Sequence, residues 1–288
     1  MSTLQLFAAC VAIWGTTWLA ITYQLGAVEP EASVCYRFLF ASLVLFGWCK
    51  ARGLALRYPM KEHAWFALQG LLMFSIGYIF VYYAEQNVVS GLVAVAYSAS
   101  PLIGMLFLRL FFGTPMTVGV ALGGALGVAG ITLIFLPEFS QIRGDRDVVL
   151  GLAFAVASVF ISSLGNMVAH RNHDARVPVW QSMAWGMLYG AFFSLVVTLA
   201  LGKPLAFAFT PGYVISLAYL AIFGSILAFG SFLTLLGQIG AARSGYVGVM
   251  VPIVALVISS FFEGFHWHAL TWVGVAVSVV GNAVILRR

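Results

Sequence analysis

The chain has 288 residues, of which 62% are hydrophobic and only 8% charged, with a formal net charge of +5. An average soluble domain has roughly 25% charged residues, so this composition excludes a water-soluble fold of the same length. The long continuous apolar runs favour spanning helices over a β-barrel, whose strands would show short alternating segments. The sequence therefore predicts an all-α polytopic membrane protein.

Apolar runs of about 20 residues, the length that a spanning helix needs, recur along the whole chain. The first run follows Met-Ser-Thr without a basic segment before it, so we expect a retained span and not a cleaved signal peptide. The connections between runs are short and leave no room for a soluble domain. Broken at charged and turn residues, the chain gives ten predicted spans: 4–25, 32–49, 64–84, 89–112, 118–136, 148–169, 178–201, 211–237, 244–263 and 269–286.

Basic residues are distributed unevenly between the two sides of these predicted spans. If the N-terminus is cytoplasmic, three bases lie outside (Arg143, Arg146, Lys203) and Arg37 lies within a span. The cytoplasmic side then holds the other ten: Lys50, Arg52, Arg57, Lys61, Arg109, Arg171, Arg176, Arg243, Arg287 and Arg288. The positive-inside rule predicts from this bias that both termini lie in the cytoplasm. The net positive charge follows from the asymmetry and gives no reason to expect nucleic-acid binding.

Prolines and glycines recur at a nearly constant offset between the two halves of the chain. The offset is 148 residues for Pro30 and Pro178, and 151 for three further pairs: Pro101 and Pro252, Gly123 and Gly274, Gly130 and Gly281. These matches predict two five-helix repeats, residues 1–137 and 138–288. Because five is odd, the second repeat would be inverted in the membrane. Inverted repeats around a central cavity are an architecture of secondary transporters that work by alternating access.

Pro101 and Pro252 are expected about twelve residues into their spans, or roughly 18 Å deep at 1.5 Å per residue. Proline removes a backbone donor and kinks a helix at such a position. We predict a pair of hinges beside the cavity, with static kinks that shape helix packing as the alternative.

The segment Trp14-Gly15-Thr16-Thr17-Trp18 resembles the opening motif of EamA-type transporters in the drug/metabolite transporter superfamily. Pro30 with Arg37 resembles the start of that family's second helix, and the two prolines resemble its repeated fourth-to-fifth helix pattern. The first half departs from the family pattern at Gly113-Thr114, where a Glu is common, whereas the second half has Glu263.

Within the superfamily, the whole chain is most similar to bacterial exporters of aromatic amino acids. This resemblance implies an inner-membrane carrier that exports aromatic or neutral amino acids and related metabolites through a central cavity. The alternatives are a multidrug or cation efflux carrier, and an exporter of nucleoside-like or sugar-phosphate-like metabolites.

Aromatic side chains with a hydroxyl or indole donor offer both apolar area and a polar handle to an amphipathic solute. Several of them share helix faces at i, i+4 spacing. Trp14, Tyr78 and Tyr97 are expected deep in the membrane, whereas Tyr82 and Tyr246 are also explained by the aromatic belt of membrane interfaces. The residues predicted to bind substrate are Trp14, Thr17, Trp18, Tyr78, Tyr82, Tyr97, Ser98, Trp185, Tyr189 and Tyr246.

Arg37 is the one charged residue well inside a predicted span, where a charge is expensive and faces a cavity or a partner. One hypothesis is that it attracts a substrate carboxylate. The other is structural: it snorkels to Glu29 or Glu31, or binds helix-end carbonyls.

We find no catalytic constellation and no metal-ligand or cofactor motif in the sequence, so we expect neither an enzyme nor a bound cofactor. Acidic residues such as Glu85 and Glu263 fall at span ends, which predicts weak or no obligatory proton coupling. The glycines Gly119, Gly123 and Gly127 give a smooth helix face suited to close packing, with a dimer interface as the alternative. The expected partners are a small-molecule substrate and the lipid bilayer, and we expect a monomer.

Overall fold

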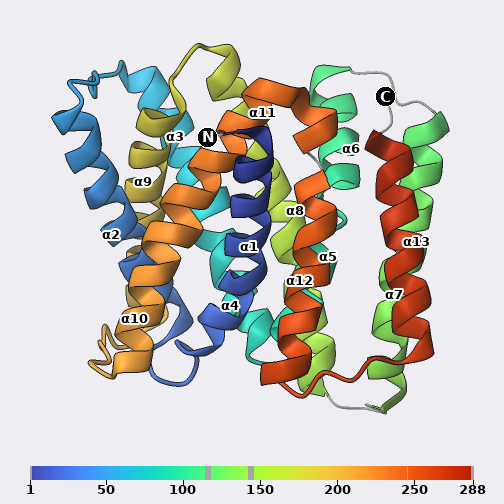
Figure 1. Ribbon diagram of the computed structural model, residues 1–288. Helices are drawn as coiled ribbons and strands as arrows, with labels where there is room; N and C mark the ends of the chain where they lie inside the picture. Colours follow the sequence, from blue (N-terminus) through green and yellow to red (C-terminus); the bar gives the residue numbers. More distant parts are fainter. Residues whose placement is uncertain (1, 114–117, 142–145, 245, 287–288) are drawn as a thin grey trace.

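A computed structural model of the chain describes residues 2–113, 118–141, 146–244 and 246–286 (Figure 1). The described residues fold almost entirely into helices joined by short loops. The α-helices are α1 (Thr3–Thr22), α2 (Pro30–Ala51), α3 (Met60–Leu71), α4 (Gly77–Glu85), α5 (Ser90–Tyr97), α6 (Ser100–Phe112), α7 (Val118–Gln141), α8 (Arg146–Asp174), α9 (Val179–Ala200), α10 (Pro211–Tyr219), α11 (Ala228–Ser244), α12 (Tyr246–Phe262) and α13 (Ala269–Leu286). Two π-helical segments are η1 (Leu72–Ile76) and η2 (Leu220–Leu227).

The described part of the chain contains no strand, so the predicted all-α class is confirmed. Seven helical stretches within it are long and apolar enough to cross a membrane. Three further apolar helices have 10–17 residues: Ala121–Leu136, Met250–Phe262 and Ala269–Gly281. The chain is therefore a multi-helix membrane protein, while membrane crossing by all ten in two inverted repeats stays a prediction.

Local sequence explains where several helices begin and end. Ser2 and Gln5 form a capping box at the start of α1, with the Ser2 amide donating to Gln5 Oε1 at 2.8 Å. Pro30 and Pro211 occupy the first positions of α2 and α10, where the missing N–H breaks no helical hydrogen bond. Glycines with positive φ stand in the loops that follow five helices: Gly26, Gly53, Gly113, Gly202 and Gly264.

Helix packing joins the two halves of the chain element by element. The helix α2 packs along α9, and α7 packs along α13, at opposite sides of the molecule (Figure 1). In the interior, α1 packs against α11 and α12, while α8 packs against α4 and α6. The first predicted span can be exchanged with the sixth, the second with the seventh, and so on. The α2–α9 and α7–α13 contacts then map onto themselves, and the contacts of α1 map onto those of α8. Two halves related by a two-fold axis would give this pattern.

Glycines allow α7 and α13 to approach through their backbones. A Cβ atom on Gly130 would lie 2.6 Å from the Gly274 carbonyl oxygen, and one on Gly281 would lie 2.6 Å from that of Gly123. The 151-residue offset converts Gly123 into Gly274 and Gly130 into Gly281. Each contact is therefore the counterpart of the other, as expected at a two-fold axis. This packing supports the helix-contact interpretation of the glycine series, while the dimer alternative remains untested.

Irregular helical segments also occur at matched places. The segment η2 begins 148 residues after η1, the same offset that relates Pro30 and Pro178.

The two predicted hinge prolines lie in different settings. Pro101 stands in the first turn of α6, after a break that separates α6 from α5, and its side chain is outside the described residues. Pro252 lies inside the continuous helix α12.

Candidate functional site

Aromatic rings from five helical elements meet in a continuous row inside the structure. Trp14 of α1 packs against Phe229 of α11, with ring centroids 5.2 Å apart, and Phe229 packs against Phe74 of η1 at 5.9 Å. Phe74 in turn packs against Phe38 of α2 at 5.2 Å, and Phe38 against Tyr78 of α4 at 4.9 Å. Two predicted site residues, Trp14 and Tyr78, thus form the ends of one aromatic row.

The π-helical segment η2 lies beside this row and accepts hydrogen bonds from Trp14 and Arg37. The Trp14 indole Nε1 donates to the Gly224 carbonyl oxygen at 3.2 Å. Thr17 lies so close that its Cγ2 would be 2.8 Å from a Cβ added to Gly224. Arg37 Nε donates to the Ser225 hydroxyl at 3.1 Å. The wider turn of a π segment changes the backbone hydrogen-bond pattern, and such segments are frequent at functional sites.

Arg37 is fully enclosed, with only 1% of its surface exposed. Its guanidinium carbon lies 4.5 Å from the centre of the Tyr78 ring and 5.2 Å from that of Phe38, within the range of a cation–π interaction. We call Trp14, Thr17, Arg37, Tyr78, Gly224 and Ser225 the central cluster. In this cluster the Trp14 indole, the Tyr78 ring and the Arg37 guanidinium lie beside the small residues of η2.

Trp18 and Tyr97 form a second contact, with ring centroids 5.1 Å apart. The Tyr97 hydroxyl shares a hydrogen bond with the Ser162 hydroxyl of α8 at 3.0 Å. Trp18 Nε1 is buried and has no hydrogen-bond partner among the described residues. This pair connects α1 with α5 and places an indole donor in the interior without a protein acceptor.

Tyr82 lies one turn beyond Tyr78 and is fully buried, donating to Gln24 Oε1 at 2.7 Å. Ser75, which the sequence places on the same face, instead bonds to Ser194 of α9 at 2.9 Å. The π segment η1 precedes Tyr78, and its wider turn changes the angular position of residues on either side of it. Tyr82 is therefore an interior residue, and the interfacial-belt explanation does not describe its environment.

Glu85, at the end of α4, is only 7% exposed, and neither of its carboxylate oxygens has a hydrogen-bond partner among the described residues. It lines a shallow hollow of about 380 Å³ together with Thr22, Leu25 and Glu263. Glu263 has a defined structural contact, because it accepts a hydrogen bond from the Ser90 backbone amide at 3.0 Å, at the start of α5. A carboxylate at a helix N-terminus is stabilising.

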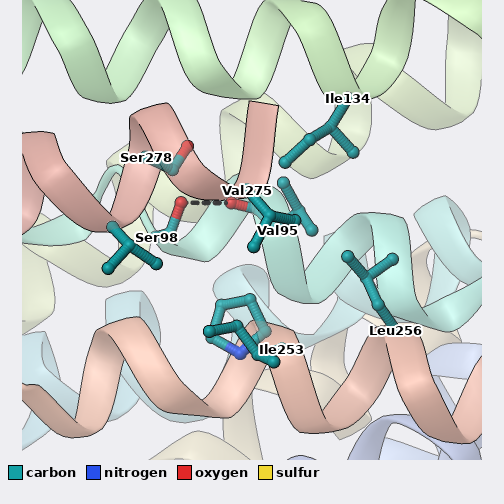
Figure 2. Close-up of a pocket in the computed structure, with 9 residues that line it drawn as sticks. Val95, Ser98, Ile134, Ile253, Leu256, Val275 and Ser278 are labelled. Carbon is teal, nitrogen blue, oxygen red and sulfur yellow. Dashed lines mark hydrogen bonds between the residues drawn. The ribbon is translucent and has the colours of Figure 1, made fainter. Parts of the chain in front are cut away.

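Ser98 and Pro252 line a different, small cavity between α5, α7, α12 and α13 (Figure 2). The Ser98 hydroxyl donates to the Val95 carbonyl oxygen at 2.7 Å, so its donor is already occupied. The free space at the centre of the cavity is about 20 Å³, enough for roughly one water molecule and too small for an organic solute. Ser98 is thus near Pro252 but away from the central cluster.

Trp185 and Tyr189 lie together in another place, where they hold the connection between α2 and α3. Trp185 Nε1 donates to the Leu56 carbonyl oxygen at 3.1 Å, and the Tyr189 hydroxyl is 3.0 Å from His63 Nδ1. The rings of His63 and Trp185 are 4.5 Å apart. None of these contacts involves a residue of the central cluster, and substrate binding by the pair stays a prediction. The side chain of Tyr246, the remaining predicted residue, lies outside the described residues.

Lys203 fixes the loop after α9 to the start of α2. Its Nζ is 3.0 Å from Glu29 Oε2 and 3.1 Å from Glu31 Oε1, and it also donates to the Tyr83 hydroxyl at 2.9 Å. Burial lowers the pKa of Lys203, but the hydrogen bonds to Tyr83, Glu29 and Glu31 outweigh it and raise the pKa above its ordinary value. Glu29 and Glu31, the two acids that the structural hypothesis paired with Arg37, are therefore bound by Lys203.

Comparison with known proteins defines the family to which this arrangement belongs. The sequence model described as the EamA-like transporter family matches residues 1–136 and again residues 149–287. The chain belongs to the EamA-like transporter family. The resemblance seen in the Trp14–Trp18 segment is thereby confirmed, and the relevant biochemical class is a membrane transporter.

Relatives in the family agree with a multi-pass inner-membrane protein. The inner membrane transporter YedA of Escherichia coli (strain K12) is 29% identical over 98% of this chain and 90% of its own length. Protein PecM of Dickeya dadantii is 26% identical, covering 89% of this chain and 82% of its own. One solved crystal structure superposes with a TM-score of 0.73 at 20% identity, over 98% of this chain and 96% of that one, and so shares the fold.

The structure adds three site residues that the sequence did not single out: Phe38, Gly224 and Ser225. A phenylalanine, a glycine and a serine inside apolar spans are common packing residues and carry no distinctive motif. Only the position of η2 beside Trp14 and Arg37 shows why small residues are needed there. A side chain on Gly224 would collide with Thr17.

Proposed function

We propose that this EamA-like transporter is an inner-membrane exporter of small organic solutes, chiefly aromatic or neutral amino acids and related metabolites. The observation that carries the proposal is the convergence of Trp14, Thr17 and Tyr78 on one interior cluster between α1, α4 and η2. Aromatic rings with polar groups at one end suit a solute that has an apolar body and a charged or polar head.

We also propose that transport occurs by alternating access between two inverted halves, with both termini in the cytoplasm. Three observations support this arrangement: the family model matches each half separately, the π segments lie at a constant offset, and the α7–α13 glycine contacts are reciprocal. The excess of basic residues on one side supports the orientation. Such repeats provide two similar conformations that open to opposite sides.

Reconstituted protein tests the activity. Proteoliposomes containing the purified chain are loaded with labelled amino acids, amines, nucleosides or sugar phosphates, and efflux is followed with and without unlabelled solute outside. We expect efflux of aromatic amino acids and acceleration by external solute, because a carrier returns faster when loaded whereas a pore does not respond. Equal efflux from protein-free vesicles for every solute would overturn the proposal, and efflux of amines alone would favour the cation-efflux alternative.

The same assay tests the site. Trp14→Ala and Tyr78→Ala are expected to impair efflux while the protein remains folded, because each removes one end of the aromatic row. Phe261→Ala is the matched control, since the Phe261 side chain is 80% exposed and lies outside the central cluster. Wild-type efflux by both Trp14→Ala and Tyr78→Ala would remove these residues from the site.

A further inference from the structure

Arg37 is a buried cation whose hydrogen-bonding capacity the protein does not fill. Its Nε bonds to Ser225, but its Nη1 has no hydrogen-bond partner among the described residues. The aromatic faces of Tyr78 and Phe38 screen the charge without accepting a hydrogen bond in the guanidinium plane. A buried ion without full pairing costs several kcal/mol in general, so its retention calls for a partner.

The acids nearest in sequence do not supply that partner. Glu29 and Glu31 are both bound by Lys203, and Glu31 also accepts a hydrogen bond from Tyr83. Glu85 feels the charge of Arg37, but no ion pair within 4.0 Å joins them in the described part of the chain. Arg37 therefore does not snorkel to Glu29 or Glu31, which was one of the two forms of the structural hypothesis. Its contacts among the described residues, including the hydroxyls of Ser225 and Tyr82, are with neutral groups.

The surroundings of the guanidinium specify what could approach it. A Cβ on Gly224 would be 3.4 Å from Arg37 Nη2, so any larger side chain at this position would press against the guanidinium. The Gly224 carbonyl binds the indole of Trp14, and the Tyr78 ring lies against the cation. The protein thus places a planar donor next to two aromatic surfaces, and a guanidinium matches the two oxygens of a carboxylate in particular.

We propose that Arg37 binds the carboxylate of the transported solute, while the rings of Trp14 and Tyr78 pack against its apolar part. The chemical class is therefore small aromatic or apolar carboxylates, among them amino acids, and it excludes solutes that are only cationic. This inference rests on the proposed export function and names the group that selects the substrate. Ser225 acts as a positioning residue, because its hydroxyl fixes the Nε side of the guanidinium.

A matched pair of solutes tests the inference. L-phenylalanine and L-phenylalaninamide share the same ring and amino group, but only the former has a carboxylate. Efflux of each from proteoliposomes is compared for the wild type, Arg37→Gln and Arg37→Lys. We expect the wild type to prefer phenylalanine by about tenfold or more, Arg37→Gln to lose that preference while still exporting the amide, and Arg37→Lys to keep part of it.

Other results would overturn the inference. One is an unchanged preference in Arg37→Gln, and another is equal wild-type efflux of both solutes. The third is an equal loss of both solutes in Arg37→Gln when its unfolding temperature equals that of the wild type. If Arg37→Gln does not fold, the double variant Arg37→Gln/Glu85→Gln, which removes both buried charges, is measured in its place. The ratio of phenylalanine efflux to phenylalaninamide efflux is then judged by the same criteria.

Binding to the detergent-purified protein separates this inference from the export function. Quenching of tryptophan fluorescence that is present in the wild type and lost in Trp14→Phe reports solute binding near Trp14 whether or not transport occurs. Tighter binding of phenylalanine than of the amide, lost in Arg37→Gln, supports the carboxylate site even if no efflux is seen, and then only the export proposal fails. Efflux of phenylalanine that is independent of Arg37 leaves the export function standing and rejects the carboxylate site.

Discussion

Arg37 and Lys203 are two cations that each lie against a tyrosine ring, at 4.5 Å from Tyr78 and 5.1 Å from Tyr83 respectively, yet they are used differently. Lys203 has 28% of its side chain exposed and contacts two carboxylates. Arg37 is 1% exposed, and its polar contacts among the described residues are the neutral hydroxyls of Ser225 and Tyr82. The cation at the membrane edge is neutralised by the protein itself, whereas the interior cation is not. The difference separates a structural charge from one that is available to a ligand.

The largest expected effect is the loss of stability in Lys203→Met. The substitution leaves Glu31, whose side chain is completely buried, as an unpaired anion. Breaking a buried pair in this way costs about 3 kcal/mol, and we expect a correspondingly lower midpoint of chemical unfolding for the detergent-purified protein. The double variant Lys203→Met/Glu31→Gln should recover most of the loss. An unchanged midpoint in the single variant would show that this ion pair is not structural.

A smaller effect on stability is expected for Arg37→Gln. Since Arg37 contacts no anion, the substitution leaves no unpaired carboxylate in contact with it and removes chiefly the cation–π interactions, worth about 1 kcal/mol. The unfolding midpoint should therefore fall less than in Lys203→Met under the same conditions. A loss as large as that of Lys203→Met would mean that Arg37 neutralises a buried acid such as Glu85, and the contrast between the two cations would disappear.

Trp14→Phe probes the polar contact beside Arg37. Phenylalanine keeps a ring near Phe229 but removes the hydrogen bond to the Gly224 carbonyl, at a cost of about 1 kcal/mol. If the bond positions the site, efflux at low solute concentration should fall roughly fivefold, which is what this energy corresponds to. Trp18→Phe is a matched control, because Trp18 Nε1 has no partner to lose. Equal effects of the two variants would contradict a specific role for the Trp14 indole.

The smallest effects are expected at the two prolines. Pro101 stands in the first turn of α6, where proline is well tolerated, so Pro101→Ala should leave efflux and stability nearly unchanged. Pro252 lacks a backbone donor inside a continuous helix, and Pro252→Ala should restore that hydrogen bond and slow efflux about twofold if α12 bends at this position during transport. A larger effect at Pro101 than at Pro252 would reverse this assignment of the hinge.

Much of the helical framework could be predicted from the sequence, because long apolar runs and charged connections have direct physical causes in a bilayer. The predicted span 269–286 coincides with α13, and the span 178–201 differs from α9 by one residue at each end. The break between α5 and α6 and the two π segments were not predicted. The π segments lie inside apolar runs without a distinguishing motif. The break coincides with Ser98, Ser100 and Pro101, a helix-start signal that the single predicted span 89–112 does not take into account.

The candidate site was only partly accessible to the same reasoning. Trp14, Thr17 and Tyr78 are brought together by the fold, but the i, i+4 pair Trp185 and Tyr189 is not, because helix spacing identifies a face without identifying its neighbour. Whether Arg37 can pair with Glu31 depends on whether another cation already binds that acid. Lys203 is 172 residues away from that acid, and no local pattern reports such a contact.

The reciprocal glycine contact between α7 and α13 has a mechanical consequence. At these glycines the two backbones approach each other directly, with few side chains such as Ile134 and Leu126 beside the contact, so little side-chain interdigitation opposes rotation of one helix against the other. The contact also joins one helix from each predicted half. If the halves move as proposed, the distance between these two helices would stay nearly constant. The α7–α13 pair would then serve as the pivot of the molecule, and the angular displacement would be greatest at the far side, where α2 lies along α9.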